Sequence, residues 1–160
     1  MKALSLWQPH ATAIGLGLKP WETRDWPTHY RGPLAIHAAK RPWGDSDEWH
    51  SDARRRIDRY VTARGPIPWA FGAVVCTCDL VECVPTSELR GRIPADHEFW
   101  GDFSDGDEGR GRWAFRLENV RLLEQPIAWR GQQGFFEVEL GAQAPEPVID
   151  AQGELFGGAL

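Results

Sequence analysis

The stretch GLKPWETR, at residues 17–24, decides the fold, because it follows an apolar segment and sets a break in the chain among three charged residues. Pro20 disfavours helix in the residue before it and cannot donate a backbone hydrogen bond, so we expect a helix to end here. If residues 22–24 are extended, Glu22 and Arg24 share one face while Thr23 points away. The sequence therefore predicts a corner between a helix and a strand, with charged side chains on one side.

The charges at this corner admit two interpretations. Lys19, Glu22 and Arg24 form either a structural ion cluster or the polar floor of a ligand pocket. Lys19 offers a compact charge for a phosphate or an oxyanion, and Arg24 offers a planar fork for a phosphate or a base edge. Glu22 can accept from an amino group, or act as a general base if burial raises its pKa. Lys19 and Glu22 are therefore candidate catalytic residues, and Arg24 is a candidate ligand-binding residue.

Composition limits the class of protein. A chain of 160 residues is long enough for one domain with a hydrophobic core. Its 18 Lys and Arg against 23 Asp and Glu give a formal charge of −5, which argues against a general polyanion binder but leaves room for a local basic cleft. Among nine tryptophans, Trp7 and Trp26 flank the corner and are candidates to stack on a base, with Gln8 beside Trp7 as a further ligand contact.

The cysteines and the hydropathy bear on the compartment. Cys76, Cys78 and Cys83 cluster in an apolar run, which indicates buried strand thiols rather than a disulfide framework or a zinc site. No segment has the length of a membrane span, and no leader pattern is present. We expect a soluble, cytoplasmic protein with no membrane partner.

The pattern of the chain predicts an α+β fold, a small β-barrel with flanking helices rather than a doubly wound sheet. A helix begins at Pro9 and ends at Gly15 or Gly17. Another covers residues 45–64. Strands are expected at residues 1–7, 34–40, 70–84, 113–123 and 134–140, with a short helix or turn at 86–88 and a loop over 96–112. The Gly-, Pro- and acid-rich segment 141–160 is expected to be a flexible tail.

The helix over residues 45–64 has a capping box and two distinct faces. Asp45 caps it, with Glu48 as the reciprocal partner. One face is apolar, carrying Trp49, Ala53, Ile57, Tyr60 and Val61. The other is basic, carrying Arg54, Arg55, Arg56, Arg59 and Arg64. The basic face is either a solvated surface or a rim that faces phosphate groups.

Three further polar residues are candidate ligand contacts. His37 lies on a strand, where it either meets a ligand or makes structural hydrogen bonds. Asp102 and Ser104 lie in a glycine-rich loop that either binds a phosphate or is capped by these two side chains. The acids of this loop (Asp102, Asp105, Asp107 and Glu108) lack the spacing of an EF-hand, so no metal site is assigned.

Several segments together resemble a known family. LSLWQP at residues 4–9 and GLKPWETR at 17–24 resemble the ASCH domain, a PUA-like β-barrel family marked by a Gly-x-Lys-x-x-Glu-x-Arg signature. The later segments YRGPLAIHA, GDFS, GRWAF and LENV, at 30–38, 101–104, 111–115 and 117–120, are similar to those that follow in that family. The resemblance implies a PUA-like domain over residues 1–140, in which the helix at 45–64 is an elaboration.

The resemblance also implies a cleft associated with RNA or nucleotides. Some members of the family bind nucleic acid, one kind cleaves single-stranded RNA, and small bacterial members hydrolyse N4-acetylcytidine. The amidohydrolases use a threonine three residues after the lysine, where this chain has Glu22, so the threonine mechanism does not transfer. The leading hypothesis is therefore RNA or nucleotide binding around Lys19, Glu22 and Arg24. The alternative is a hydrolase that acts on RNA or nucleosides: a single-strand ribonuclease, with magnesium as its cofactor, or an N4-acetylcytidine amidohydrolase.

The tail carries a separate short motif. QGELF at residues 152–156 resembles the Gln-x-x-Leu-Phe peptide by which bacterial replication proteins bind the sliding clamp. Gln152, Leu155 and Phe156 are the residues that match. A flexible segment with two adjacent apolar anchors can fold into a groove on binding.

Overall fold

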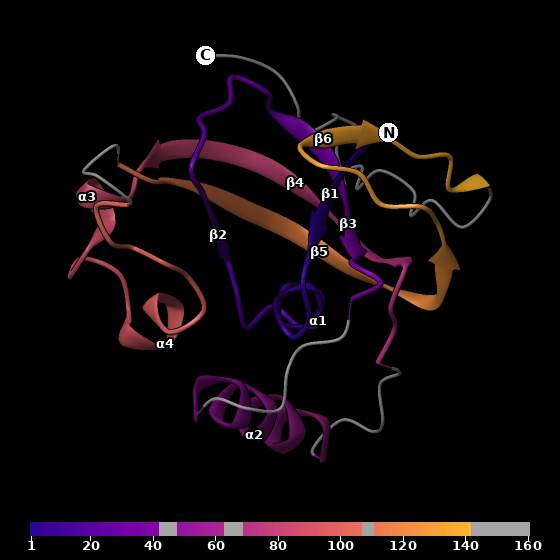
Figure 1. The fold of residues 1–160 in the computed structure, drawn as a ribbon, viewed down its shortest axis with the longest axis horizontal. Coiled ribbons are helices and arrows are strands. Elements are labelled where there is room, and N and C mark those ends of the chain that lie inside the picture. The colour runs from indigo at the N-terminus through magenta and orange to yellow at the C-terminus, as the bar shows by residue number, and fades with distance from the viewer. Residues whose placement is uncertain (42–47, 63–68, 107–110, 142–160) are drawn as a thin grey trace, which may run out of the picture.

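Six strands form one curled, mixed sheet in the order β2-β5-β4-β3-β1-β6 (Figure 1). The computed structural model describes residues 1–41, 48–62, 69–106 and 111–141. Strand β1 is parallel to β3, and the other neighbouring pairs are antiparallel. The strands are β1 Lys2–Leu6, β2 Trp21–Arg24, β3 Gly32–Ala38, β4 Ala73–Pro85, β5 Trp113–Ala128 and β6 Phe135–Glu137; the helices are α1 His10–Gly15, α2 Glu48–Thr62, α3 Thr86–Leu89 and α4 Ala95–Glu98.

The two longest strands give the sheet its curl. Strands β4 and β5 pair along most of their length, and their register shifts at three places. Each irregularity bends a strand and increases its twist, so the sheet closes into a half-barrel of the PUA-like, α+β kind. Leu4, Ile36 and Phe115 belong to the main core cluster, and Ala3 and Val74 to a second one.

Side chains bridge the gap between the two ends of the sheet. Arg24 on β2 donates through Nη2 to the carbonyl oxygen of Ser5 on β1, at 2.7 Å. Just after β2, the ring of Trp26 meets Phe115 of β5 and Phe135 of β6 edge-on, each at 5.2 Å between centroids. Arg24 and Trp26 thus join the two edges of the half-barrel, where the sheet, over the described residues, has no sixth strand pairing to close it.

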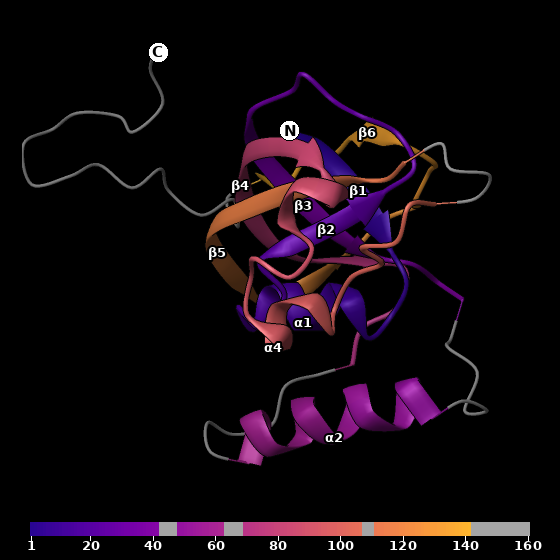
Figure 2. The ribbon, with the colours of Figure 1, turned by 90° about the vertical axis from the view of Figure 1, so that its left-hand side faces the viewer.

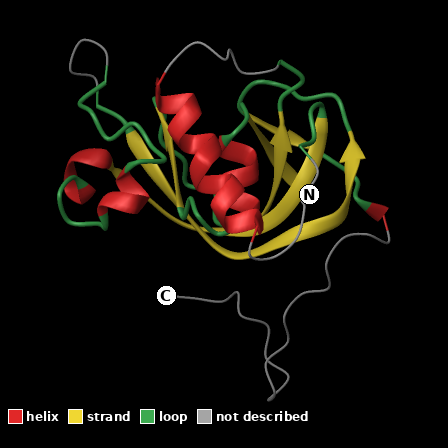
Figure 3. Cartoon of the chain, turned by 90° about the horizontal axis from the view of Figure 1, so that it is seen from below, coloured by secondary structure: helices red, strands yellow, loops and turns green. Residues whose placement is uncertain are grey.

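Helix α2 lies beyond α1 and α4, on one side of the sheet (Figure 2). From below, the curl of the sheet is seen behind α2 (Figure 3). Ala53 and Ile57 are fully buried and share a cluster with Ala13 of α1 and Trp100 after α4. This confirms part of the apolar face predicted for the helix. The expected cap at Asp45 and the end beyond Thr62 lie outside the described residues, as do the side chain of Trp49 and all of Arg64.

The elements before residue 90 follow the predictions from the sequence closely. Helix α1 ends at Gly15, strand β2 begins directly after Pro20, and α3 covers the short helix expected at 86–88. Gly17 takes a φ of 73°, in the left-handed region that ends helices. The end of α1 and the start of β2 therefore lie where Pro20 and the glycines before it predict them.

The second half of the chain corrects three boundaries. The predicted loop over 96–112 begins instead with the helical turn of α4, in which Phe99 N–H donates to the carbonyl of Ala95 at 2.9 Å. Strand β5 extends to Ala128, because Val74 and Ala73 of β4 supply partners for its last residues despite Pro126. Strand β6 is only three residues long. The predicted tail beyond residue 141 lies outside the described residues.

No helix among the described residues is long and apolar enough to cross a membrane. The three cysteines are unpaired by disulfides, with Cys76 and Cys78 buried in β4 as predicted from the apolar run around them. Burial raises the pKa of both thiols, so they are held as neutral core groups.

Candidate functional site

Lys19, Glu22 and Arg24 form one continuous chain of ion pairs. Lys19 Nζ lies 3.1 Å from Glu22 Oε2, and Arg24 Nε lies 2.9 Å from Glu22 Oε1. Lys19 also donates to the carbonyl oxygen of Trp100, after α4. With only 1% exposure, Lys19 is the largest fully buried side chain in the described part of the protein. The sequence prediction that these three charges meet is therefore confirmed in the structure.

The local sequence explains this placement. Backbone N–H groups of Leu18 and Lys19 both donate to the carbonyl of Ala13, which caps α1 and turns Lys19 towards the core. Strand β2 then begins, and alternation sends Glu22 and Arg24 to one face. Thr23 points the other way, where its Oγ1 accepts a hydrogen bond from Asp102 N–H at 2.9 Å.

The electrostatics of the cluster differ between its members. Burial lowers the pKa of Lys19 from 10.5, although Glu22 opposes the shift. Burial alone would raise the pKa of Glu22, but Lys19, Arg24 and His10 together hold it below 4.5. Glu22 is thus a carboxylate at neutral pH, with one oxygen facing each cation. The idea that burial raises its pKa to make it a general base is wrong for this structure.

Arg24 is the member of the cluster that reaches solvent. Its side chain is 23% exposed, whereas that of Glu22 is 9% exposed. Nη2 donates to the Ser5 carbonyl at 2.7 Å, while the buried Nε makes an ion pair with Glu22 at 2.9 Å but no hydrogen bond to a described residue, so the guanidinium is oriented by one hydrogen bond and one ion pair. A ligand that approached the cluster from solvent would meet this pre-oriented fork first.

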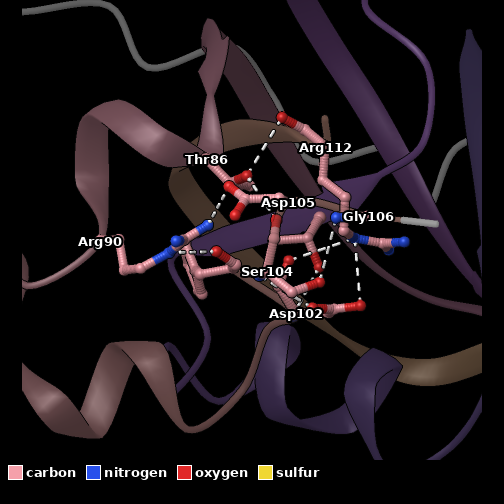
Figure 4. A network of polar contacts seen from close by, with 9 residues as sticks. Thr86, Arg90, Asp102, Ser104, Asp105, Gly106 and Arg112 are labelled. Atoms are coloured by element: carbon pink, nitrogen blue, oxygen red, sulfur yellow. Dashed lines mark hydrogen bonds and ion pairs between the residues drawn. The ribbon is translucent and has the colours of Figure 1, made fainter. Parts of the chain in front are cut away.

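The glycine-rich loop beside the cluster is held by its own side chains (Figure 4). Asp102 Oδ1 accepts from Ser104 N–H at 3.0 Å, and Ser104 Oγ accepts from Gly106 N–H at 3.3 Å. Arg112 Nε donates to the carbonyl of Asp102 at 3.2 Å and pairs with its carboxylate at 3.3 Å. Turn capping by Asp102 and Ser104, one of the two interpretations from the sequence, is thus what the structure displays.

A shallow pocket of about 410 Å³ opens on the side of this loop. Its lining comes from the residue after α3, the end of α4 and the loop: Arg90, Glu98, Gly101, Phe103, Ser104 and Asp105. Arg90 donates to the carbonyl of Phe103 at 2.8 Å and to Asp105 Oδ1 at 2.7 Å. Gly101 follows Trp100, whose carbonyl receives Lys19, so the pocket and the buried cluster share one backbone segment.

The other candidate ligand residues occupy different places. Gln8 is buried, donating to the carbonyl of Ala70 at 2.9 Å and accepting from Thr12 N–H at 3.1 Å. His37 is also buried, with Nδ1 at 3.0 Å from Ser5 Oγ and Nε2 at 3.0 Å from the carbonyl of Trp129. Trp26 packs in the barrel. Trp7, in contrast, is 62% exposed.

Three arginines of α2 pair with nearby acids, and Arg59 donates to the carbonyl of Arg55. Arg54 lies 3.8 Å from Asp58, Arg55 lies 2.8 Å from Asp52, and Arg56 lies 2.7 Å from Asp96. Arg56 also covers the ring of Phe99 at 4.0 Å. These contacts fit the solvated-surface interpretation of that face.

No group of three or more His, Cys, Asp or Glu side chains within residues 1–41, 48–62, 69–106 and 111–141 is arranged to hold a metal ion. Asp107 and Glu108, two of the loop acids considered from the sequence, lie outside those ranges.

Reasoning from the sequence missed the backbone partners of the cluster. The carbonyls of Trp100 and Ser5 receive Lys19 and Arg24, and a carbonyl has no residue-type signal in a sequence. Arg112 was also missed, although its place just before β5 and beside the glycine-rich loop offered a weak signal.

Comparisons with known proteins agree with the fold. The family model described as ASCH domain matches residues 4–121. The structure is similar to that of ASCH from Zymomonas mobilis, with 18% identity, a TM-score of 0.56 and 87% of each chain covered. Two variants of that protein, one with a tyrosine replaced by phenylalanine and one with a serine replaced by alanine, match at 17% and 18% identity. Both have a TM-score of 0.51 and cover 87% of this chain, against 90% and 88% of theirs.

A search of curated protein sequences found no match to this chain.

Proposed function

Because the chain belongs to the ASCH domain family, we propose that it binds single-stranded RNA, or a nucleotide drawn from RNA, at the solvent edge of the Lys19–Glu22–Arg24 cluster. The observation that carries the proposal is the buried Lys19 ammonium. Taking an ion out of water costs several kcal/mol, and a hydrophobic residue would fill the same space at lower cost. Buried, coupled charges of this kind are typical of functional sites.

The geometry supports a division of roles. Lys19 and Glu22 are positioning residues, since their polar atoms face one another and the Trp100 carbonyl. Arg24 is the direct contact, because it is the exposed member and its fork suits a phosphate or a base edge. Asp102 and Ser104 shape the loop beside the cluster, and we propose that the loop and its pocket contact the same ligand.

Binding assays test this proposal. A fluorescein-labelled single-stranded 12-mer RNA is titrated by anisotropy, and cytidine 5′-monophosphate by calorimetry. Arg24→Met should weaken both by about tenfold or more, because it removes charge-assisted hydrogen bonds worth ~1.5–3 kcal/mol. Arg31→Met, which removes an exposed arginine before β3, is the matched control and should leave both unchanged. Equal affinities for Arg24→Met and the wild type, with the fold intact by circular dichroism, would refute the proposal.

A hydrolase is the second candidate, and one observation favours it. Burial lowers the pKa of Lys19, which brings the neutral amine, a possible proton acceptor, closer to the working pH. Single-stranded RNA and N4-acetylcytidine, each with and without magnesium, are the substrates to test. Turnover that Lys19→Met abolishes while RNA binding persists supports this candidate. Binding without turnover of either substrate rules out both reactions named here.

We propose a separate contact for the tail. Gln152, Leu155 and Phe156 lie outside the described residues, so the proposal rests on the motif alone. A truncation after residue 144 should lose recovery on immobilised sliding clamp while keeping RNA affinity. Equal recovery of the full chain and the truncation would end the idea.

A further inference from the structure

The ends of β1, β3 and β5 and the start of β4 lie together beside α1. The residues next to them bring aromatic and basic side chains to one surface. Hydrogen bonds between backbones continue the sheet there: Ala39 N–H donates to the Leu6 carbonyl at 2.8 Å, Gly72 N–H to that of Ala38 at 2.8 Å, and Trp129 N–H to that of Gly72 at 3.0 Å. The ends of β3 and β5 and the start of β4 lie close together in Figure 1. Adjacent strands are about 4.8 Å apart, so four of them span about 14 Å.

The residues next to these bonds form what we call the strand-end patch: Trp7, Lys40, Arg41, Phe71 and Arg130. All five are exposed, Trp7 by 62% and Phe71 by 38%. Arg41 Cζ lies 5.5 Å from the centroid of the Trp7 ring. A Cβ built on Gly72 would lie 3.6 Å from Lys40 Cβ, which places Lys40 against the backbone that follows Phe71.

The chemistry of the patch is unusual for this protein. The chain carries a formal charge of −5, yet the three ionisable residues of the patch are all basic. An exposed tryptophan with a guanidinium near one face still has ring surface free for a second flat group. Exposed aromatic faces interleaved with cations fit single-stranded nucleic acid, whose bases stack while its phosphates meet the cations.

The position of the patch links it to the proposed RNA site. Arg24 holds the carbonyl of Ser5, and Trp7 follows Ser5 by two residues, about 7 Å along an extended chain. We propose that the strand-end patch is a second contact surface for single-stranded RNA, which holds the nucleotides that lead away from the Arg24 edge. This inference rests on the proposed function. It assigns Trp7 to the RNA nucleotides that lead away from the cluster, not to the nucleotide bound at the cluster itself.

Three patch variants test the inference against one control. Trp7→Ala should lower affinity for the 12-mer RNA about tenfold, since stacking on an aromatic ring contributes ~1–3 kcal/mol per base, and Trp7→Phe should restore most of it. Lys40→Ala/Arg41→Ala should reduce the slope of log K against log salt by about 1.4, since each phosphate contact on a single strand contributes ~0.7. The control, Lys2→Ala/Arg31→Ala, removes the same two residue types at the opposite end of β3 and should change neither.

The two RNA proposals fail in different ways. If 12-mer affinity is unchanged in every patch variant but falls in Arg24→Met, the patch inference is wrong and the proposed function stands. If the patch variants lower the affinity for the 12-mer while Arg24→Met does not, the patch binds RNA and the proposed function at Arg24 is wrong. Affinity for cytidine 5′-monophosphate should not change in the patch variants, and a loss there contradicts the assignment of Trp7. No RNA binding by the wild type overturns both proposals. Loss of binding to anionic phospholipid vesicles in the patch variants, with unchanged RNA affinity, overturns the patch inference alone.

Discussion

At the scale of single residues, Lys19 explains why Glu22 occupies its position. An ammonium with 1% exposure needs an anion in contact, and Glu22 at 3.1 Å supplies it. A threonine in place of Glu22 would leave Lys19 with the Trp100 carbonyl but no counter-charge. The amidohydrolases have a threonine at this position. In this chain Glu22 occupies it, and its carboxylate pairs with both Lys19 and Arg24.

Glu22→Gln tests how tightly this pair is coupled. The change leaves a buried ammonium without its carboxylate and should lower the free energy of unfolding by about 3 kcal/mol. Lys19→Met should cost less, because Glu22 keeps Arg24 as a partner at 2.9 Å. The double variant should be more stable than the sum of the single effects predicts, by ~1 kcal/mol or more. Urea denaturation measures all four proteins, and strictly additive effects would show that the pair is not coupled.

The pH dependence of stability follows from the same carboxylate. The folded-state pKa of Glu22 lies below 4.5, so folding favours its ionised form. Its stabilising contribution is therefore complete above pH 4.5 and is lost as pH falls through the folded-state pKa. The difference in unfolding free energy between the wild type and Glu22→Gln should be constant from pH 7 to about 5.5 and shrink below 4.5. Urea denaturation at four pH values measures it; a difference that grows in acid contradicts the assignment.

At the scale of elements, His37 joins three segments of the barrel. It lies on β3. Its Nδ1 is hydrogen-bonded to Ser5 Oγ of β1, and its Nε2 is hydrogen-bonded to the carbonyl oxygen of Trp129 after β5. Gly131 approaches it so closely that an added Cβ would lie 2.4 Å from His37 Cε1 and 2.7 Å from Ser5 Oγ. The segment after β5 can pack here only with a glycine. His37 is therefore a structural residue, the commoner role of an isolated strand histidine.

Gly131→Ala should accordingly destabilise the fold by ~1–3 kcal/mol through overpacking. The same change made in a His37→Ala background should cost less, because the ring at 2.4 Å is gone while Ser5 Oγ, at 2.7 Å, remains. Thermal unfolding by circular dichroism compares the two single variants with the double variant. A loss in Gly131→Ala that is undiminished in the His37→Ala background would show that the clash is not with the histidine ring.

Local elements were the most predictable part of this chain. Pro20 and Gly17 act within a few residues of themselves, so the end of α1, the start of β2 and the shared face of Glu22 and Arg24 follow from the sequence. The contact of Lys19 with Trp100 joins residues 81 positions apart, and no local rule places them together. The length of β5 was underestimated for the same reason, since its last residues are held by the start of β4.

At the scale of the whole molecule, the tryptophans show what only the fold decides. Trp7 and Trp26 both flank the corner in the sequence and have equal claims to a base-stacking role. The curl of the sheet separates them, because it brings Phe115 and Phe135 to Trp26 and leaves Trp7 beyond the end of β1. Composition could not distinguish a ring that closes a barrel from a ring that faces solvent.

This separation predicts opposite phenotypes for the same substitution. Trp26→Ala should lower the free energy of unfolding by about 3 kcal/mol, because it removes the ring that bridges β5 and β6 across the gap in the barrel. Trp7→Ala should stay within ~0.5 kcal/mol of the wild type, since its ring is 62% exposed, while it weakens RNA binding. Urea denaturation and RNA anisotropy on the same two preparations give both readouts. If Trp26→Ala were as stable as the wild type, the half-barrel would not depend on this bridge, and Trp26 would again be a candidate to stack on a base.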